Sequence, residues 1–163
     1  MKRREFIVAS SILGVYGTLN SREIQDDNIL SWLVIDEVFD ILFPKTDFMP
    51  SAKEFNATVY LQINSKHKTF DKDDIVYILQ GALDFNDAFP QFLKSNLKEK
   101  NKIIEETNES DYGQSWLTKL VYYGIEAMLS DPIYGGNVNN IAWESLNHQT
   151  GIPQPKQKYA KVL

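Results

Sequence analysis

The sequence contains no cysteine and only two histidines, His67 and His148, which lie far apart in the chain. Without cysteine the chain can form no disulfide, no thiolate metal site and no cysteine nucleophile. With two distant histidines, a zinc site or a histidine-based catalytic triad would need unusual partners. The residue types behind the commonest metal and hydrolytic chemistries are therefore scarce.

Positive charge is also scarce over most of the chain. Residues 26–155 carry twenty acidic residues against ten lysines. The remaining basic residues cluster at the two ends: Lys2, Arg3, Arg4, Arg22, Lys156, Lys158 and Lys161. An acidic body repels phosphate groups, so we expect no nucleic-acid partner.

Long apolar runs are missing as well. The apolar stretch from Phe6 to Tyr16 is interrupted by two serines and a glycine, and it is shorter than the roughly 20 residues that a membrane-spanning helix needs. A basic start, a short apolar centre and a polar segment after it are typical of a bacterial export signal. Any association with a membrane is therefore expected to be indirect.

The basic start resembles the twin-arginine class of export signal, in which paired arginines precede apolar residues. We predict that residues 1–21 are such a signal, with Arg3, Arg4 and Phe6 recognised by the twin-arginine translocase. Residues 22–163 would then form the folded domain, located in the periplasm or at the periplasmic face of the inner membrane. A basic, amphipathic N-terminal helix is the alternative interpretation.

Apolar residues in the body recur at helical spacing, and no stretch shows sustained period-two alternation. We predict helices over about 29–43, 52–64, 71–89 and 115–130, and a shorter one that ends near residue 107. The expected fold is all-α: a single-domain bundle of about five helices followed by an irregular C-terminal strap. Residues 26–28, Ser51 and Ser115 are expected to cap the N-terminal ends of three of these helices, and the acidic residues at 71–74 are expected to open the helix over 71–89 by complementing its dipole.

The segment Asp131-Pro132-Ile133-Tyr134-Gly135-Gly136-Asn137 ends the last long helix and combines a helix breaker, an aromatic residue and two glycines. This composition predicts a tight, fixed turn. No Lys-Ser or Lys-Thr pair follows the glycines, so the segment is not a phosphate-binding loop. No serine lies in a nucleophile-elbow pattern, and no usual catalytic constellation is present.

Together, the twin-arginine leader, the phrase Ile41-Leu42-Phe43-Pro44-Lys45-Thr46-Asp47, the 131–137 segment and Trp143 give a pattern that resembles the gluconate 2-dehydrogenase subunit 3 family. The resemblance implies a non-catalytic small subunit of a membrane-bound, FAD-dependent dehydrogenase for sugars or sugar acids. The flavoprotein large subunit would hold FAD, and a cytochrome c subunit would hold haem c. This chain would carry no cofactor and would escort the folded large subunit through twin-arginine export.

The resemblance also suggests partner-binding residues. They are Asp131, Pro132, Tyr134, Gly135, Gly136, Asn137 and Trp143, with the two aromatic residues as interface anchors. The alternative is that the segment only caps the preceding helix while Trp143 packs on the chain's own core. Two further hypotheses stay open: a free-standing, exported helical protein that binds a ligand or serves in stress, and an enzyme that uses Asp131 and Tyr134 for acid–base chemistry.

Overall fold

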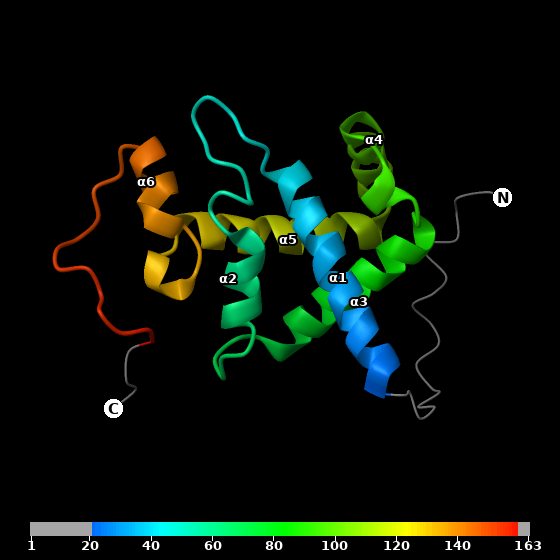
Figure 1. The fold of residues 1–163 in the computed structure, drawn as a ribbon, viewed down its shortest axis with the longest axis horizontal. Helices are drawn as coiled ribbons and strands as arrows, with labels where there is room; N and C mark the ends of the chain where they lie inside the picture. Colours follow the sequence, from blue (N-terminus) through cyan, green and yellow to red (C-terminus); the bar gives the residue numbers. More distant parts are fainter. Residues whose placement is uncertain (1–20, 160–163) are drawn as a thin grey trace.

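The computed structural model describes residues 21–159, with side chains from residue 28 onward. This part of the chain is helical and contains no strand, which confirms the predicted all-α domain (Figure 1). The α-helices are α1 (Ser21–Leu42), α2 (Ala57–Asn64), α3 (Lys72–Ala88), α4 (Leu97–Asn108), α5 (Asp111–Leu129) and α6 (Ile141–Ser145). Three short 3-10 helices are η3 (Phe92–Lys94), η4 (Pro132–Tyr134) and η5 (Val138–Asn140). Within residues 21–159, no helix has both the length and the apolar character to cross a membrane.

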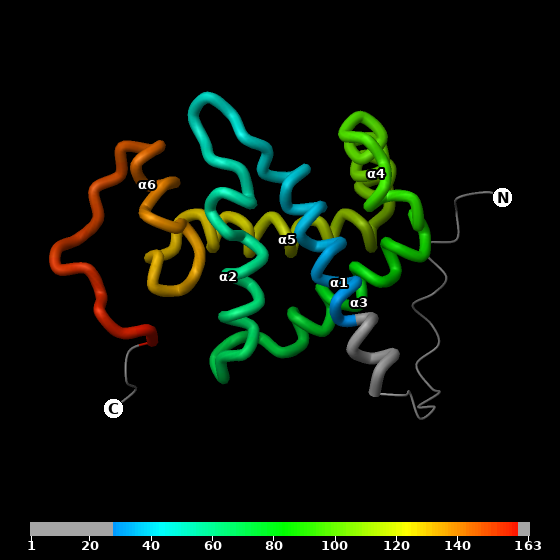
Figure 2. The backbone as a smooth tube through the Cα atoms, viewed as in Figure 1, coloured from blue at the N-terminus to red at the C-terminus, as the bar shows by residue number. Residues whose placement is uncertain are grey.

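Helix α5 lies along the long axis of the molecule, with α1 crossing it (Figure 1). α1 packs against α2, α3, α4 and α5, so it is the central helix that its dense apolar sequence predicts. α6 lies at the C-terminal end of α5. The chain after α6 then runs around that end of the molecule and returns toward α2, as the predicted irregular strap (Figure 2).

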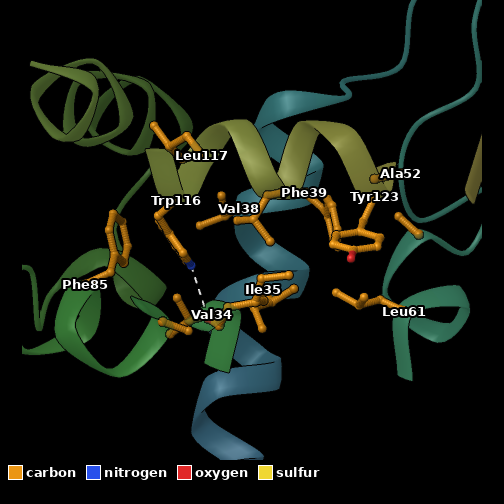
Figure 3. Close-up of a cluster of buried hydrophobic side chains, with 14 of the residues drawn as sticks. Val34, Ile35, Val38, Phe39, Ala52, Leu61, Phe85, Trp116, Leu117 and Tyr123 are labelled. Atoms are coloured by element: carbon orange, nitrogen blue, oxygen red, sulfur yellow. Dashed lines mark hydrogen bonds between the residues drawn. The ribbon is translucent and has the colours of Figure 1, made fainter. Parts of the chain in front are cut away.

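The core lies where α1, α3 and α5 meet (Figure 3). Val34, Val38 and other apolar residues of α1 are fully buried there with Trp116 of α5. The Trp116 indole nitrogen donates a 3.1 Å hydrogen bond to the carbonyl oxygen of Ile78. A Cβ atom at Gly81 would lie 2.3 Å from the Trp116 ring, so α3 can approach α5 this closely only because residue 81 has no side chain.

Side-chain caps explain where α3 and α4 begin. The Asp71 carboxylate accepts hydrogen bonds from the backbone amides of Asp73 and Asp74, and this cap starts α3 at the predicted position. Asn96 and Glu99 form a capping box at the start of α4. Both caps satisfy amides that otherwise have no partner in a first helical turn.

Three boundary predictions were wrong. Helix α5 begins at Asp111 rather than after Ser115, because the Ser110 hydroxyl caps it by accepting a 3.0 Å hydrogen bond from the Gly113 amide. α1 begins at Ser21, before the expected caps at residues 26–28. The predicted capping box at Ser51 does form, but the chain makes only a turn there. Asn56 then adopts a left-handed conformation (φ 59°), and α2 starts at Ala57.

Only part of the apolar surface around α2 is buried. Tyr60 is buried, as is Phe55 before the helix, but Val59 and Ile63 are more than a third exposed. Leu61 and Asn64 of this helix also turn toward the core.

Candidate functional site

The 131–137 segment forms a compact turn that its own side chains and backbone hold together. The Asp131 carboxylate accepts a 3.0 Å hydrogen bond from the Ile133 amide and so caps η4, with Pro132 in the first position of that turn. Gly135 ends η4 with φ at 95°, a conformation that glycine adopts without steric cost. The predicted tight, fixed turn is therefore present.

Asn137 and Gly136 fasten this turn to α5. Asn137 is fully buried. Its side-chain amide donates to the Ser130 carbonyl oxygen at 3.1 Å, and its side-chain oxygen accepts from the Ala142 amide at 2.9 Å. A Cβ atom at Gly136 would lie 2.3 Å from the Ala127 carbonyl oxygen, so the turn lies directly on the helix backbone.

Trp143 also packs at the C-terminal end of α5. Its indole nitrogen donates a 3.1 Å hydrogen bond to the Leu129 carbonyl oxygen, and the residue is only 8% exposed. Trp143, Gly136 and Asn137 thus behave as the alternative interpretation expected, capping the helix and packing on the chain's own core. Their role toward a partner stays a prediction, as does acid–base chemistry by Asp131 and Tyr134.

Tyr134 is half-buried and connects the turn to two distant segments. Its carbonyl oxygen accepts a 2.9 Å hydrogen bond from the Asn64 side chain in α2, and its hydroxyl accepts from the Tyr159 amide at 3.3 Å. The two tyrosine rings meet edge to face, with their centroids 5.2 Å apart. Tyr159 also stacks on His67 at 3.6 Å and donates its hydroxyl to Asn64. The strap, α2 and the turn are therefore one connected unit.

These contacts border an open groove of about 640 Å³ between α2, α5, the segment before α3, and Tyr159 of the strap. We call it the tyrosine groove. Its walls carry six phenyl or phenol rings, those of Tyr60, Phe70, Tyr122, Tyr123, Tyr134 and Tyr159. Its charged side chains are Asp71, Asp74, Lys119, Glu126 and Asp131.

Asp74 is the best-compensated carboxylate in the groove. The Lys119 ammonium lies 2.7 Å from one of its oxygens, and the Tyr123 hydroxyl donates to the other at 2.7 Å. Burial alone would raise the pKa of Asp74, but these two hydrogen bonds outweigh it, and the pKa is lowered.

Glu126 stands in a different environment. Desolvation by the surrounding protein raises its pKa above the usual glutamate range, and a hydrogen bond from the Tyr60 hydroxyl offsets only part of this shift. Burial, together with the Glu126 carboxylate, raises the pKa of Tyr60 as well, so Tyr60 stays a hydrogen-bond donor. No basic side chain among the described residues forms an ion pair with Glu126.

An exposed apolar face of α5 adjoins the groove. Tyr122, Ile125 and Leu129 are 58%, 42% and 47% exposed, and their spacing places them on one side of the helix. With Glu126 and Ser130 they surround a shallow hollow of about 340 Å³. We call these three residues the α5 apolar strip. Tyr122 and Glu126 line both the hollow and the groove, so the two surfaces are continuous.

Arg3, Arg4 and Phe6, which the sequence predicts to form an export signal, lie outside the described residues. Within residues 28–159, no group of three or more His, Asp or Glu side chains is arranged to hold a metal ion. Comparison of the chain with protein-family models, curated proteins and solved structures gives no match.

Sequence reasoning found the turn but missed most of the tyrosine groove. Tyr122, Tyr123, Glu126 and Tyr159 were not predicted as site residues. Tyr122 and Glu126 are four residues apart, so they lie one turn apart on the same side of α5, which is a detectable signal. The contribution of Tyr159 has no such signal, because it depends on the return path of the strap.

Proposed function

We propose that this chain is the non-catalytic small subunit of a periplasmic, membrane-associated FAD-dependent dehydrogenase complex. It binds the flavoprotein large subunit and escorts it through twin-arginine export. The sequence phrases at residues 41–47 and 131–137, with the paired arginines near the start, support this family assignment. FAD and haem c belong to the partner subunits, and substrate oxidation takes place on the flavoprotein.

The observation that carries the proposal is the α5 apolar strip. Three large side chains face solvent on one side of a helix that is otherwise central to the fold. Contiguous apolar surface of this kind is typical of protein-interaction sites, because burying it in a partner removes it from water. Asp131, Pro132 and Tyr134 are partly exposed at the C-terminal end of the same helix and extend the proposed interface.

In this proposal the small subunit provides a docking surface for the large subunit and catalyses no reaction itself. The rigid turn and the capped end of α5 present a preformed surface, so docking orders few groups and loses little conformational entropy. The large subunit binds after FAD insertion, and the leader of the small subunit then directs the folded complex to the translocase.

Lysine replacement of Arg3 and Arg4 in the full chain tests the export step. We expect the activity of the partner dehydrogenase to remain in the cytoplasm, because lysine keeps the charge but not the paired arginines. Arg22→Lys makes the same chemical change outside the pair and should leave the activity in the periplasm. Periplasmic activity with Arg3 and Arg4 both replaced would contradict the escort role.

A second candidate function is that of a free-standing, exported ligand-binding protein. The tyrosine groove favours it, because an open pocket with aromatic walls and a few polar groups is the usual form of a small-molecule site. Purification from the native membrane separates the two functions: a flavoprotein in stoichiometric amount supports the small-subunit role, and its absence supports the second candidate.

A further inference from the structure

The tyrosine groove holds more negative charge than its own cations neutralise. Among the described residues, four carboxylates line it, those of Asp71, Asp74, Glu126 and Asp131, and Lys119 is the one lysine or arginine that does so. Lys119 is already paired with Asp74. Asp71 and Asp131 accept hydrogen bonds from backbone amides as helix caps. Within the described part of the chain, no ammonium group pairs with Glu126; the Tyr60 hydroxyl donates to it instead.

Glu126 faces aromatic surface rather than water alone. Tyr122 lies one turn before it on α5, and Tyr60 donates its hydroxyl to it from α2. The rings of Tyr122 and Tyr123 meet edge to face with their centroids 5.0 Å apart. Aromatic faces attract cations electrostatically, and a neighbouring carboxylate strengthens that attraction.

The groove is also built before any ligand arrives. Asn64 joins α2 to the turn through the Tyr134 carbonyl, and Tyr159, stacked on His67, bonds to both Asn64 and Tyr134 from the strap. Because the side chains of a preformed pocket are already ordered, binding a ligand there costs little conformational entropy.

We propose that the tyrosine groove binds an organic cation, with its ammonium group beside Glu126 and its apolar stem against Tyr122. The ammonium group belongs either to a free small amine or to a lysine side chain of a bound protein. The aromatic walls favour an alkylated or lysine-like ammonium over a bare metal ion, which needs several oxygen ligands. This proposal does not rest on a flavoprotein partner.

Calorimetric or NMR titration of the purified full chain tests it with three probes. Choline represents a free amine, Nα-acetyl-lysine methylamide represents a lysine side chain, and 3,3-dimethyl-1-butanol is the uncharged isostere of choline. We expect at least one cation to bind about tenfold more tightly than the isostere, the ratio that corresponds to one charge-assisted contact. Tighter binding of the lysine amide identifies a protein side chain as the source, and tighter binding of choline identifies a free amine.

Variants locate the site. Glu126→Gln should weaken cation binding about tenfold, because it removes the charge and keeps an acceptor for Tyr60. Glu105→Gln removes an exposed charge from α4, outside the groove, and should bind like the parent chain. Tyr122→Leu should weaken binding several-fold while Tyr122→Phe retains it, because phenylalanine keeps the ring face. Tyr122 is exposed, so neither change disturbs the core.

Equal affinity for choline and its uncharged isostere would overturn the proposal. Failure of all three probes to bind would overturn it as well. So would unchanged cation affinity in Glu126→Gln, because the ammonium would then lie elsewhere on the protein.

Discussion

The side-chain amide of Asn64 in α2 donates a 2.9 Å hydrogen bond to the carbonyl oxygen of Tyr134, seventy residues later in the chain. The same amide donates to the Tyr60 carbonyl oxygen at 2.7 Å, and the Asn64 side-chain oxygen accepts from the Tyr159 hydroxyl. One buried side chain therefore connects α2, the turn after α5 and the C-terminal strap. These are three of the segments that form the tyrosine groove.

Replacing Asn64 with leucine should destabilise the domain by about 1–3 kcal/mol, because the Tyr134 carbonyl oxygen loses a partly buried donor. Urea unfolding followed by circular dichroism measures the change. Asn101 is the control, since it is exposed on α4 and donates only to the Leu97 carbonyl oxygen. Asn101→Leu should change stability by no more than about 0.5 kcal/mol. Equal effects of the two substitutions would mean that Asn64 does not connect the segments.

The contact of Gly136 with α5 predicts a second difference between matched variants. Gly136→Ala would place a methyl group 2.3 Å from the Ala127 carbonyl oxygen, where only backbone movement gives relief. We expect a loss of about 1–3 kcal/mol in unfolding free energy, the usual range for overpacking. Gly151→Ala is the matched control, because no atom lies within 4 Å of its new methyl group. If Gly136→Ala proved as stable as Gly151→Ala, the turn would not lie on the helix.

Asp74 predicts how stability falls in acid. Its pKa is lower in the folded state than its usual value of 3.8, so the contribution of its ionised form is present above that value. The contribution is lost as the pH falls from there through the lowered folded pKa. Asp74→Asn should therefore destabilise the domain by about 1 kcal/mol at pH 7 and by less at pH 3. Urea unfolding at the two pH values measures this, and a pH-independent difference would contradict it.

The raised pKa of Glu126 predicts the opposite change of stability with pH. Its pKa is raised above the usual value of 4.5, so the folded state disfavours its ionised form. Stability is then greater below pH 4.5 and decreases as the pH rises through the folded pKa. Glu126→Gln should raise the midpoint of thermal unfolding at pH 7 relative to the parent chain and have little effect below pH 4. A lower midpoint at pH 7 would show that the charged carboxylate stabilises the fold instead.

The sequence predicted elements where local chemistry decides the structure. The all-α fold follows from helical spacing, the start of α3 follows from its acidic first turn, and the tight turn follows from its proline and glycines. It failed where two local signals compete. Serine is a good N-terminal cap at either position, Ser110 or Ser115. The helix starts after Ser110, whose hydroxyl accepts a hydrogen bond from the Gly113 amide, and Ser115 lies inside the helix.

The residues that the 131–137 turn packs against could not be identified from the sequence of the turn alone. Gly136 and Asn137 hold the turn against Ala127 and Ser130 of the same chain, as the helix-capping alternative expected, and their role toward a partner stays a prediction. The tyrosine groove could not be predicted from local sequence either, because Tyr60 and Tyr159 come together only where the strap returns to α2. Contacts between distant segments depend on packing of the whole domain, which spacing and composition do not encode.

The α5 apolar strip allows the proposed docking to be tested without disturbing the core. Ile125→Glu introduces a charge into the strip at an exposed position. Val76→Glu introduces the same charge on α3, where residue 76 is 66% exposed and does not line the groove or the hollow. Both variants should unfold at similar urea concentrations, so a difference between them reports on binding.

The most direct test is the flavin content of the complex purified from native membranes through a tag on this chain. We predict that the parent chain and Val76→Glu bring down a flavoprotein that releases stoichiometric FAD on denaturation, while Ile125→Glu brings down at least tenfold less. The absence of flavin from the parent preparation, under conditions that keep membrane complexes intact, would contradict the account.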